Sequence, residues 1–134
     1  MKVLVATDGS EQAMKAVQRG LEMAEQGAEV SLMSVAYYAD MDATFFNIQE
    51  KLEKEAKANL EKAKAVFDAK GIKVETILEA GMVPANNIIR RVTEDKFDRL
   101  IMGSTGKSGF SLALMGSTAA KVVAHAPCEV TIVR

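Results

Sequence analysis

A stretch rich in glycine and hydroxyl side chains, residues 103–118, carries the most recognisable chemistry of this 134-residue sequence. It reads GSTGKSGFSLALMGST. Glycines let the main chain approach an anion closely and adopt positive φ angles, and serine and threonine hydroxyls donate hydrogen bonds. Lys107 adds a positive charge that suits a phosphate. The stretch therefore predicts a phosphate-binding loop, and the alternative is a linking loop that ends in a serine helix cap.

The common phosphate-binding motifs do not fit this stretch. Gly103–Ser108 ends in the Gly-Lys-Ser of a P-loop, but only two residues separate Gly103 from Gly106, whereas a P-loop needs four. The segment Thr7–Ser10 contains no Gly-x-Gly-x-x-Gly fingerprint for dinucleotides and too few glycines and hydroxyls for a flavodoxin-like loop. Asp8 stands without the acidic neighbours that a receiver domain needs. The sequence therefore argues against P-loop, dinucleotide-binding, flavodoxin-like and receiver proteins.

The elements that must position the stretch alternate between apolar strands and amphipathic helices. We expect strands at 3–6, 30–35 (with 37–38 as an extension), 74–78, 100–102 and 130–133, and helices from a cap at Asp8 or Ser10 to Gly27, at 48–70, from Pro84 through Val92, and around 117–125. Such alternation predicts a parallel sheet covered by helices on both faces, with doubly buried strands. Ligands of such sheets bind beyond the carboxyl ends of the strands. Two segments lie there: Thr7–Ser10 after the strand at 3–6, and 103–118 after the strand at 100–102.

Residues 39–47 match no regular element and place two aromatic side chains, Phe45 and Phe46, in an expected loop. Most large apolar side chains are buried, so we expect both to fold back onto the core. A partner surface or a lid is the alternative interpretation.

Composition and charge exclude several classes of protein. The chain has the size of one domain, 1–134, and its 17 basic and 18 acidic residues give a net charge of -1, which offers no general attraction for nucleic acid or an anionic membrane. Its single cysteine, Cys128, and single histidine, His125, cannot form an internal disulfide or a cysteine zinc site. No apolar run is long enough to span a membrane, and Met1–Ala6 is too short for a signal peptide. We expect a cytoplasmic protein that binds neither nucleic acid nor membrane.

The spacing Gly103-x-x-Gly106, nine residues, Gly116-Ser117 resembles the ATP-binding motif of the universal stress protein family. The opening Val3–Glu11, the junction Ile101–Ser104 and the ending His125–Arg134 also resemble that family. The resemblance covers essentially the whole chain. It implies a three-layer α/β sandwich with a five-stranded parallel sheet, Rossmann-like and of the adenine nucleotide alpha-hydrolase-like type, in the strand order 3-2-1-4-5. It also implies a homodimer formed through the last strand, Val130 to Val133.

The resemblance further implies an ATP site. In that site Asp8 would contact the ribose or adenine region, Val35 would offer main-chain groups to the base, and Thr7 and Met102 would lie beside the nucleotide. The phosphate end would consist of Gly103, Gly106, Gly116 and Ser117, with Lys107, Ser108 and Thr118 as neighbours. Any Mg²⁺ would be bound through the phosphates, because no protein metal cluster is visible in the sequence. One departure from the family is Gly81-Met82-Val83-Pro84, which is one residue longer than the usual Gly-x-Pro step.

The leading hypothesis is an ATP-binding regulatory module of the stress response that acts as a homodimer, with protein partners that the sequence does not name. One alternative is an enzyme that slowly hydrolyses ATP or phosphorylates itself, although the sequence shows no general base and we assign no catalytic residue. The other is a nucleotide-independent dimeric scaffold that uses Phe45, Phe46 and the last strand.

Overall fold

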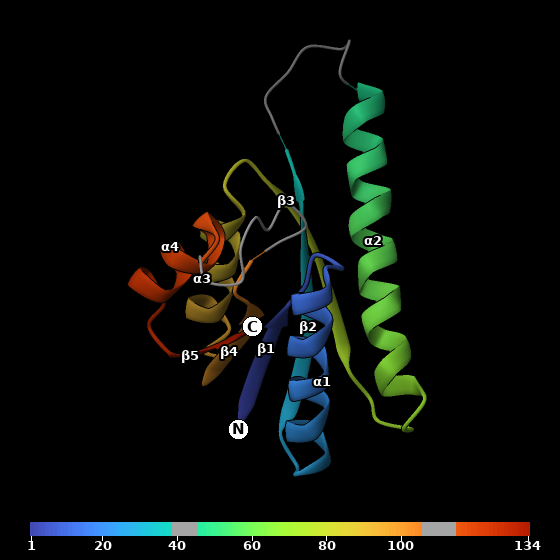
Figure 1. The fold of residues 1–134 in the computed structure, drawn as a ribbon, viewed down its shortest axis with the longest axis vertical. Coiled ribbons are helices and arrows are strands. Elements are labelled where there is room, and N and C mark those ends of the chain that lie inside the picture. The colour runs from blue at the N-terminus through green and yellow to red at the C-terminus, as the bar shows by residue number, and fades with distance from the viewer. Residues whose placement is uncertain (39–45, 106–114) are drawn as a thin grey trace.

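The computed structural model describes residues 1–38, 46–105 and 115–134. The elements are β1 (Lys2–Ala6), α1 (Glu11–Glu25), β2 (Glu29–Tyr37), α2 (Phe46–Asp68), β3 (Glu75–Gly81), α3 (Pro84–Glu94), β4 (Arg99–Gly103), α4 (Ser117–His125) and β5 (Glu129–Val133) (Figure 1). The strands form one five-stranded sheet in the order β3-β2-β1-β4-β5. All four strand pairs are parallel. The predicted fold and strand order are confirmed.

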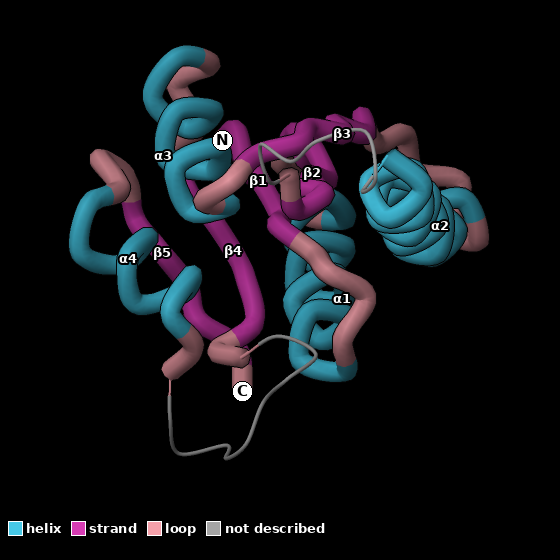
Figure 2. The backbone as a smooth tube through the Cα atoms, turned by 90° about the horizontal axis from the view of Figure 1, so that it is seen from above, coloured by secondary structure: helices cyan, strands magenta, loops and turns pink. Residues whose placement is uncertain are grey.

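Two helices cover each face of the sheet, which gives three layers (Figure 2). Successive side chains of a strand point to opposite faces. In β1, Val3 and Val5 therefore pack with Phe67 beneath α1 and α2, while Leu4 packs on the other face with α3 and α4. The long apolar run of β1 is thus explained by a strand that is buried on both sides.

The edge strands correct the expectation of doubly buried strands. The residues of β3 alternate between exposed and half-buried, and Leu78 is 45% exposed. After the exposed Glu129, β5 is half-buried throughout. Each edge strand has a neighbouring strand on one side alone, and the helices cover it incompletely.

The predicted bounds of β3 and α2 are also wrong. Pairing of β2 with β3 continues to Tyr37 and Gly81, so β3 includes Glu79–Gly81, whose composition did not indicate a strand. Helix α2 begins at Phe46 rather than at 48 and ends at Asp68. The side chains of Phe45 and Phe46 lie outside the described residues, so their predicted packing stays a prediction. None of the helices in the described ranges is long and apolar enough to cross a membrane.

Candidate functional site

A pocket of about 400 Å³ lies at the carboxyl end of the sheet. It lies at the end of β1, the strand that has β2 on one side and β4 on the other. Its lining comes from β1 and the following loop (Ala6, Thr7, Asp8), α1 (Ala13), β2 (Met33, Val35), α3 (Pro84, Ile88), the end of β4 and beyond (Met102, Gly103, Ser104, Thr105) and the start of α4 (Gly116, Ser117, Thr118, Ala119). This is the switch point at which open parallel sheets bind their ligands.

Every predicted site residue that the structure describes lines this pocket: Thr7, Asp8, Val35, Met102, Gly103, Gly116, Ser117 and Thr118. The structure brings these residues together from the loop after β1, from β2, from the end of β4 and from the start of α4. Gly106, Lys107 and Ser108 lie outside the described residues, so their predicted role stays a prediction.

The two ends of the pocket differ in chemistry. On the side of β2 and α3 the lining is apolar, with Met33, Val35, Pro84 and Ile88. On the side of β4 and α4 the lining contains, beside Met102 and Ala119, glycines and the hydroxyl side chains of serine and threonine. Asp8, in the loop after the central strand β1, lies between the two sides. A ligand that fits both ends has a flat or apolar part and a polar or charged part.

The polar end contains the start of α4. Gly116 is the N-cap of this helix, and among the described residues no side chain caps it. The first amides of a helix have no partner within the helix, and they carry the positive end of its dipole. Such a terminus binds anions. The serine cap of the linking-loop interpretation is therefore wrong, because the cap is a glycine.

Ser104 and Thr105 place two further hydroxyls at this end. The main-chain N–H of Ser104 donates to the carbonyl of Val133 at 2.8 Å, and its carbonyl accepts from the N–H of Gly116 at 2.7 Å. The Ser104 side chain is buried, and within the described ranges neither its hydroxyl nor that of Thr105 has a hydrogen-bond partner. A buried hydroxyl without a partner is costly, so both hydroxyls fit a ligand with acceptor oxygens. Sequence reasoning noted these hydroxyls but did not place them in the site, because burial decides their role.

Gly103 is required for a reason other than the expected one. A Cβ at this position would lie 2.9 Å from Cβ of Gln12 and 3.0 Å from the main-chain N of Ala13. Gly103 thus lets the end of β4 pack against the first turn of α1. Neither motif glycine that the structure describes has a positive φ, since Gly103 lies outside that region and Gly116 has φ -64°.

Local hydrogen bonds shape the loop that carries Asp8. The N–H of Thr7 donates to the carbonyl of Met33 at 2.8 Å, and the N–H of Gly9 donates to Oγ1 of Thr7 at 3.2 Å. The N–H of Ser10 donates to Oδ1 of Asp8 at 2.9 Å. Ser10 is the N-cap of α1, and its Oγ accepts from the N–H of Ala13 at 3.2 Å. Asp8 therefore shapes the turn, whereas Ser10 caps the helix.

Comparison with known proteins decides the family. The sequence matches the profile of the universal stress protein family over residues 1–134. The chain belongs to the universal stress protein family. It is 32% identical to universal stress protein MJ0531 of Methanocaldococcus jannaschii over 99% of this chain and 81% of that protein.

Solved structures, a universal stress protein among them, share the fold. Protein MJ0577 superposes with a TM-score of 0.85 at 30% identity and covers 98% of this chain and 94% of its own. A universal stress protein crystallised in complex with cAMP superposes with a TM-score of 0.75 at 27% identity and covers 100% of this chain and 97% of its own.

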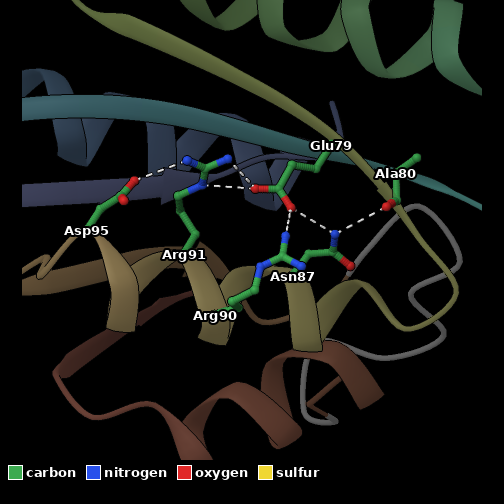
Figure 3. A network of polar contacts seen from close by, with 6 residues as sticks. All are labelled: Glu79, Ala80, Asn87, Arg90, Arg91 and Asp95. Carbon is green, nitrogen blue, oxygen red and sulfur yellow. Dashed lines mark hydrogen bonds and ion pairs between the residues drawn. The ribbon is translucent and has the colours of Figure 1, made fainter.

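The segment Gly81–Pro84 leads into α3 and is one residue longer than the usual Gly-x-Pro step of universal stress proteins. The position of α3 matters for the site, because Pro84 and Ile88 form one wall of the pocket. Figure 3 shows how a polar network fixes this helix. Nδ2 of Asn87 donates to Oε1 of Glu79 on β3 at 2.9 Å and to the carbonyl of Ala80 at 3.2 Å. A Cβ at Gly81 would lie 2.0 Å from Oδ1 of Asn87, so only glycine leaves room for this amide.

Two arginines of α3 complete the network around Glu79. Arg91 donates from Nε and Nη2 to Oε2 of Glu79 at 2.9 and 2.5 Å and from Nη1 to Oδ2 of Asp95 at 3.1 Å, and Arg90 pairs with Oε1 of Glu79. Burial by itself raises the pKa of Glu79, but the hydrogen bonds from Asn87 and Arg91 and the two arginine charges outweigh it and hold the pKa below its usual value. The hydrogen bonds to Glu79 and Asp95 raise the pKa of Arg91.

Sequence reasoning missed this network. The spacing of Asn87, Arg91 and Asp95 at i, i+4 and i+8 places them on one side of a helix and could have indicated it. Their partner Glu79 could not be recognised, because the end of β3 was not predicted.

Proposed function

We propose that this protein binds an adenine nucleotide in the pocket at the ends of β1 and β4, and that ATP is its main ligand. The observation that carries the proposal is the division of the pocket into an apolar end and a more polar end. The polar end contains a helix start that no described side chain caps and the buried hydroxyl of Ser104. A base fits the first end and phosphates fit the second. The relative with cAMP bound supports a ligand of this class.

The lining residues have distinct roles in this proposal. Met33, Pro84 and Ile88 pack against the base, and main-chain groups of Val35 bind its edge. Asp8 lies between the two ends, where it accepts hydrogen bonds from ribose hydroxyls. The main-chain amides at the start of α4 bind the phosphates, together with the hydroxyl of Ser104.

The proposal also covers the predicted residues that the structure does not describe. Gly106, Lys107 and Ser108 would complete the phosphate end. Mg²⁺, when present, would be held by the phosphates rather than by a cluster of carboxylates. A cytoplasmic location belongs to the proposal, because cellular metabolism supplies the nucleotide there.

We further propose that the protein acts as a homodimer through β5 and regulates protein partners in the stress response. What supports the dimer is the position of β5 at the edge of the sheet, with Val130, Ile132 and Val133 only half-buried. An open edge strand is a natural site of pairing with a second chain. Binding of ATP without turnover is our leading interpretation over slow hydrolysis or self-phosphorylation, since we assign no general base.

Calorimetric titration of nucleotide-free protein with ATP, AMP and adenosine tests the proposal. ATP and AMP should bind, and adenosine should bind more weakly because it lacks the anion. Ile88→Ala should lower the affinity for all three ligands, whereas Ser104→Ala should lower the affinity only for ATP and AMP. Absence of binding at millimolar ATP would overturn the proposal.

Two further assays separate the alternatives. Formation of ADP, or transfer of label from ATP to the protein, would favour the enzyme. Sedimentation should give the mass of a dimer, and a monomer at all concentrations would refute pairing through β5. Partner capture that does not change with ATP would favour the scaffold.

A further inference from the structure

The side chain of Asn59 on α2 reaches a residue of the pocket lining, Asp8. Its Nδ2 donates to the main-chain carbonyl of Asp8 at 2.9 Å, although the two residues lie 51 positions apart in sequence. Figure 1 shows the loop between β1 and α1 reaching toward α2. The contact therefore joins a pocket residue to a helix that contributes no residue to the described pocket lining.

The geometry of Gly9 shows how closely the Asn59 amide lies against the loop. Gly9 has φ +79°, and a Cβ there would lie 2.3 Å from Oδ1 of Asn59 and 2.7 Å from its Cγ. The side-chain amide occupies the space that any other residue at position 9 would fill. The loop conformation and the position of α2 are thus matched to each other.

The remaining contacts of the loop are local or main-chain. Side chains of Thr7, Asp8 and Ser10 bond N–H groups only two or three residues away, and Thr7 adds a main-chain bond to β2. Among the described residues, Asn59 is the one side chain from another element that hydrogen-bonds residues 7–10. Local turns set the shape of the loop, and Asn59 sets where the Asp8 main chain lies relative to the helical layer.

We propose that Asn59 is a positioning residue that holds Asp8 in place for the ligand and couples the docking of α2 to occupancy of the pocket. This inference rests on the proposed function, because Asp8 acts on the ligand only if a nucleotide binds. Binding sites linked through one structural contact influence each other reciprocally. Bound nucleotide therefore stabilises the docked position of α2, and a change that loosens α2 lowers the affinity for the nucleotide.

Asn59→Ala tests the affinity part. Loss of one hydrogen bond at the loop should weaken ATP binding about threefold to tenfold. The melting temperature without ligand should change little, because alanine favours the helix more than asparagine does and offsets the lost bond. The matched control is Lys57→Ala on the exposed side of α2, which should bind ATP as the wild type does. Asn59→Gln, which retains an amide donor, should recover part of the affinity.

A double-mutant cycle with Asp8→Ala separates positioning from a general structural effect. If Asn59 acts through Asp8, Asn59→Ala should weaken ATP binding less in the Asp8→Ala background than in the wild type. Hydrogen exchange of α2 should slow on addition of ATP in the wild type and less in Asn59→Ala. Unchanged affinity of Asn59→Ala, or effects of the two substitutions that simply add, would overturn the inference while the proposed function stands. Failure of the wild type to bind ATP would overturn the proposed function itself and the inference with it.

Discussion

Replacing Glu79 by glutamine tests whether the network on β3 holds α3, the wall of the pocket, in place. Glutamine keeps the shape of the side chain and one acceptor oxygen but loses the charge. The Glu79 side chain is only 10% exposed, whereas those of Arg91 and Arg90 are 32% and 54% exposed. The arginines can therefore regain water when the charge is lost, while the carboxylate position stays largely dry.

The magnitude follows from these exposures. A hydrogen bond to a charged group contributes about 1.5–3 kcal/mol. Solvent screening reduces the share of the exposed Arg90, so the pair with Arg91 dominates. We expect Glu79→Gln to lower the free energy of unfolding by about 2 kcal/mol, which for a chain of this size corresponds to a fall in Tm of about 6–10 °C.

The assay is urea unfolding of wild type and variant, with Glu129→Gln as the matched control. Glu129 forms an ion pair with Arg99 at 2.7 Å, but its side chain is 69% exposed. An exposed pair contributes little, so this control should lose less than about 1 kcal/mol. Equal losses for the two variants would refute the reasoning, because burial of Glu79 would then add nothing.

The pH dependence gives a second check. The folded-state pKa of Glu79 lies below its usual value of 4.5, so its ionisation stabilises the fold above that pH. This contribution is lost as the pH falls from 4.5 through the folded-state pKa. The stability difference between wild type and Glu79→Gln should therefore shrink with acid. A difference that stays constant well below pH 4.5 would contradict the direction of the shift.

Three other substitutions test the site. Gly103→Ala should cost about 1–3 kcal/mol in urea unfolding, because the added Cβ would lie 2.9–3.0 Å from the first turn of α1, and it should weaken ATP in calorimetry. Ser104→Ala should leave the unliganded protein as stable or slightly more stable, since its buried hydroxyl has no partner within the described ranges, yet lower ATP affinity several-fold. Gly9→Ala should destabilise more than Gly71→Ala in urea unfolding. Both glycines have positive φ, but the Cβ at Gly71 would meet open space whereas that at Gly9 would meet Asn59; equal losses would contradict that clash.

The central elements could be predicted from sequence because their signals are local. An apolar run such as Val3–Ala6 indicates a strand buried on both faces, and the structure buries all of it. The glycine spacing placed Gly103 and Gly116 in one pocket, because both follow from where β4 ends and α4 begins. Strand order followed from a family resemblance that spans the chain.

What could not be predicted depends on packing between distant residues. The continuation of β3 to Gly81 is fixed by pairing with Tyr37, not by the composition of Glu79–Gly81. The need for glycine at 103 comes from the approach of Gln12, not from its own backbone angle. Such requirements arise only once two elements are in contact.

The role of Asn59 at the candidate functional site could not be predicted for the same reason. In sequence it is one polar residue among many on a charged helix, and nothing near it indicates a ligand. Its role follows from the fit of its amide over Gly9 and from the donor it presents to Asp8, and both depend on how α2 packs on the sheet. A substitution in the buried residues of α2, such as Leu60→Ala, should therefore lower the affinity for ATP as well as the stability of the fold, although Leu60 does not line the pocket. If Leu60→Ala lowers stability and leaves ATP affinity at the wild-type value, α2 can move without moving Asp8, and the coupling through Asn59 does not operate.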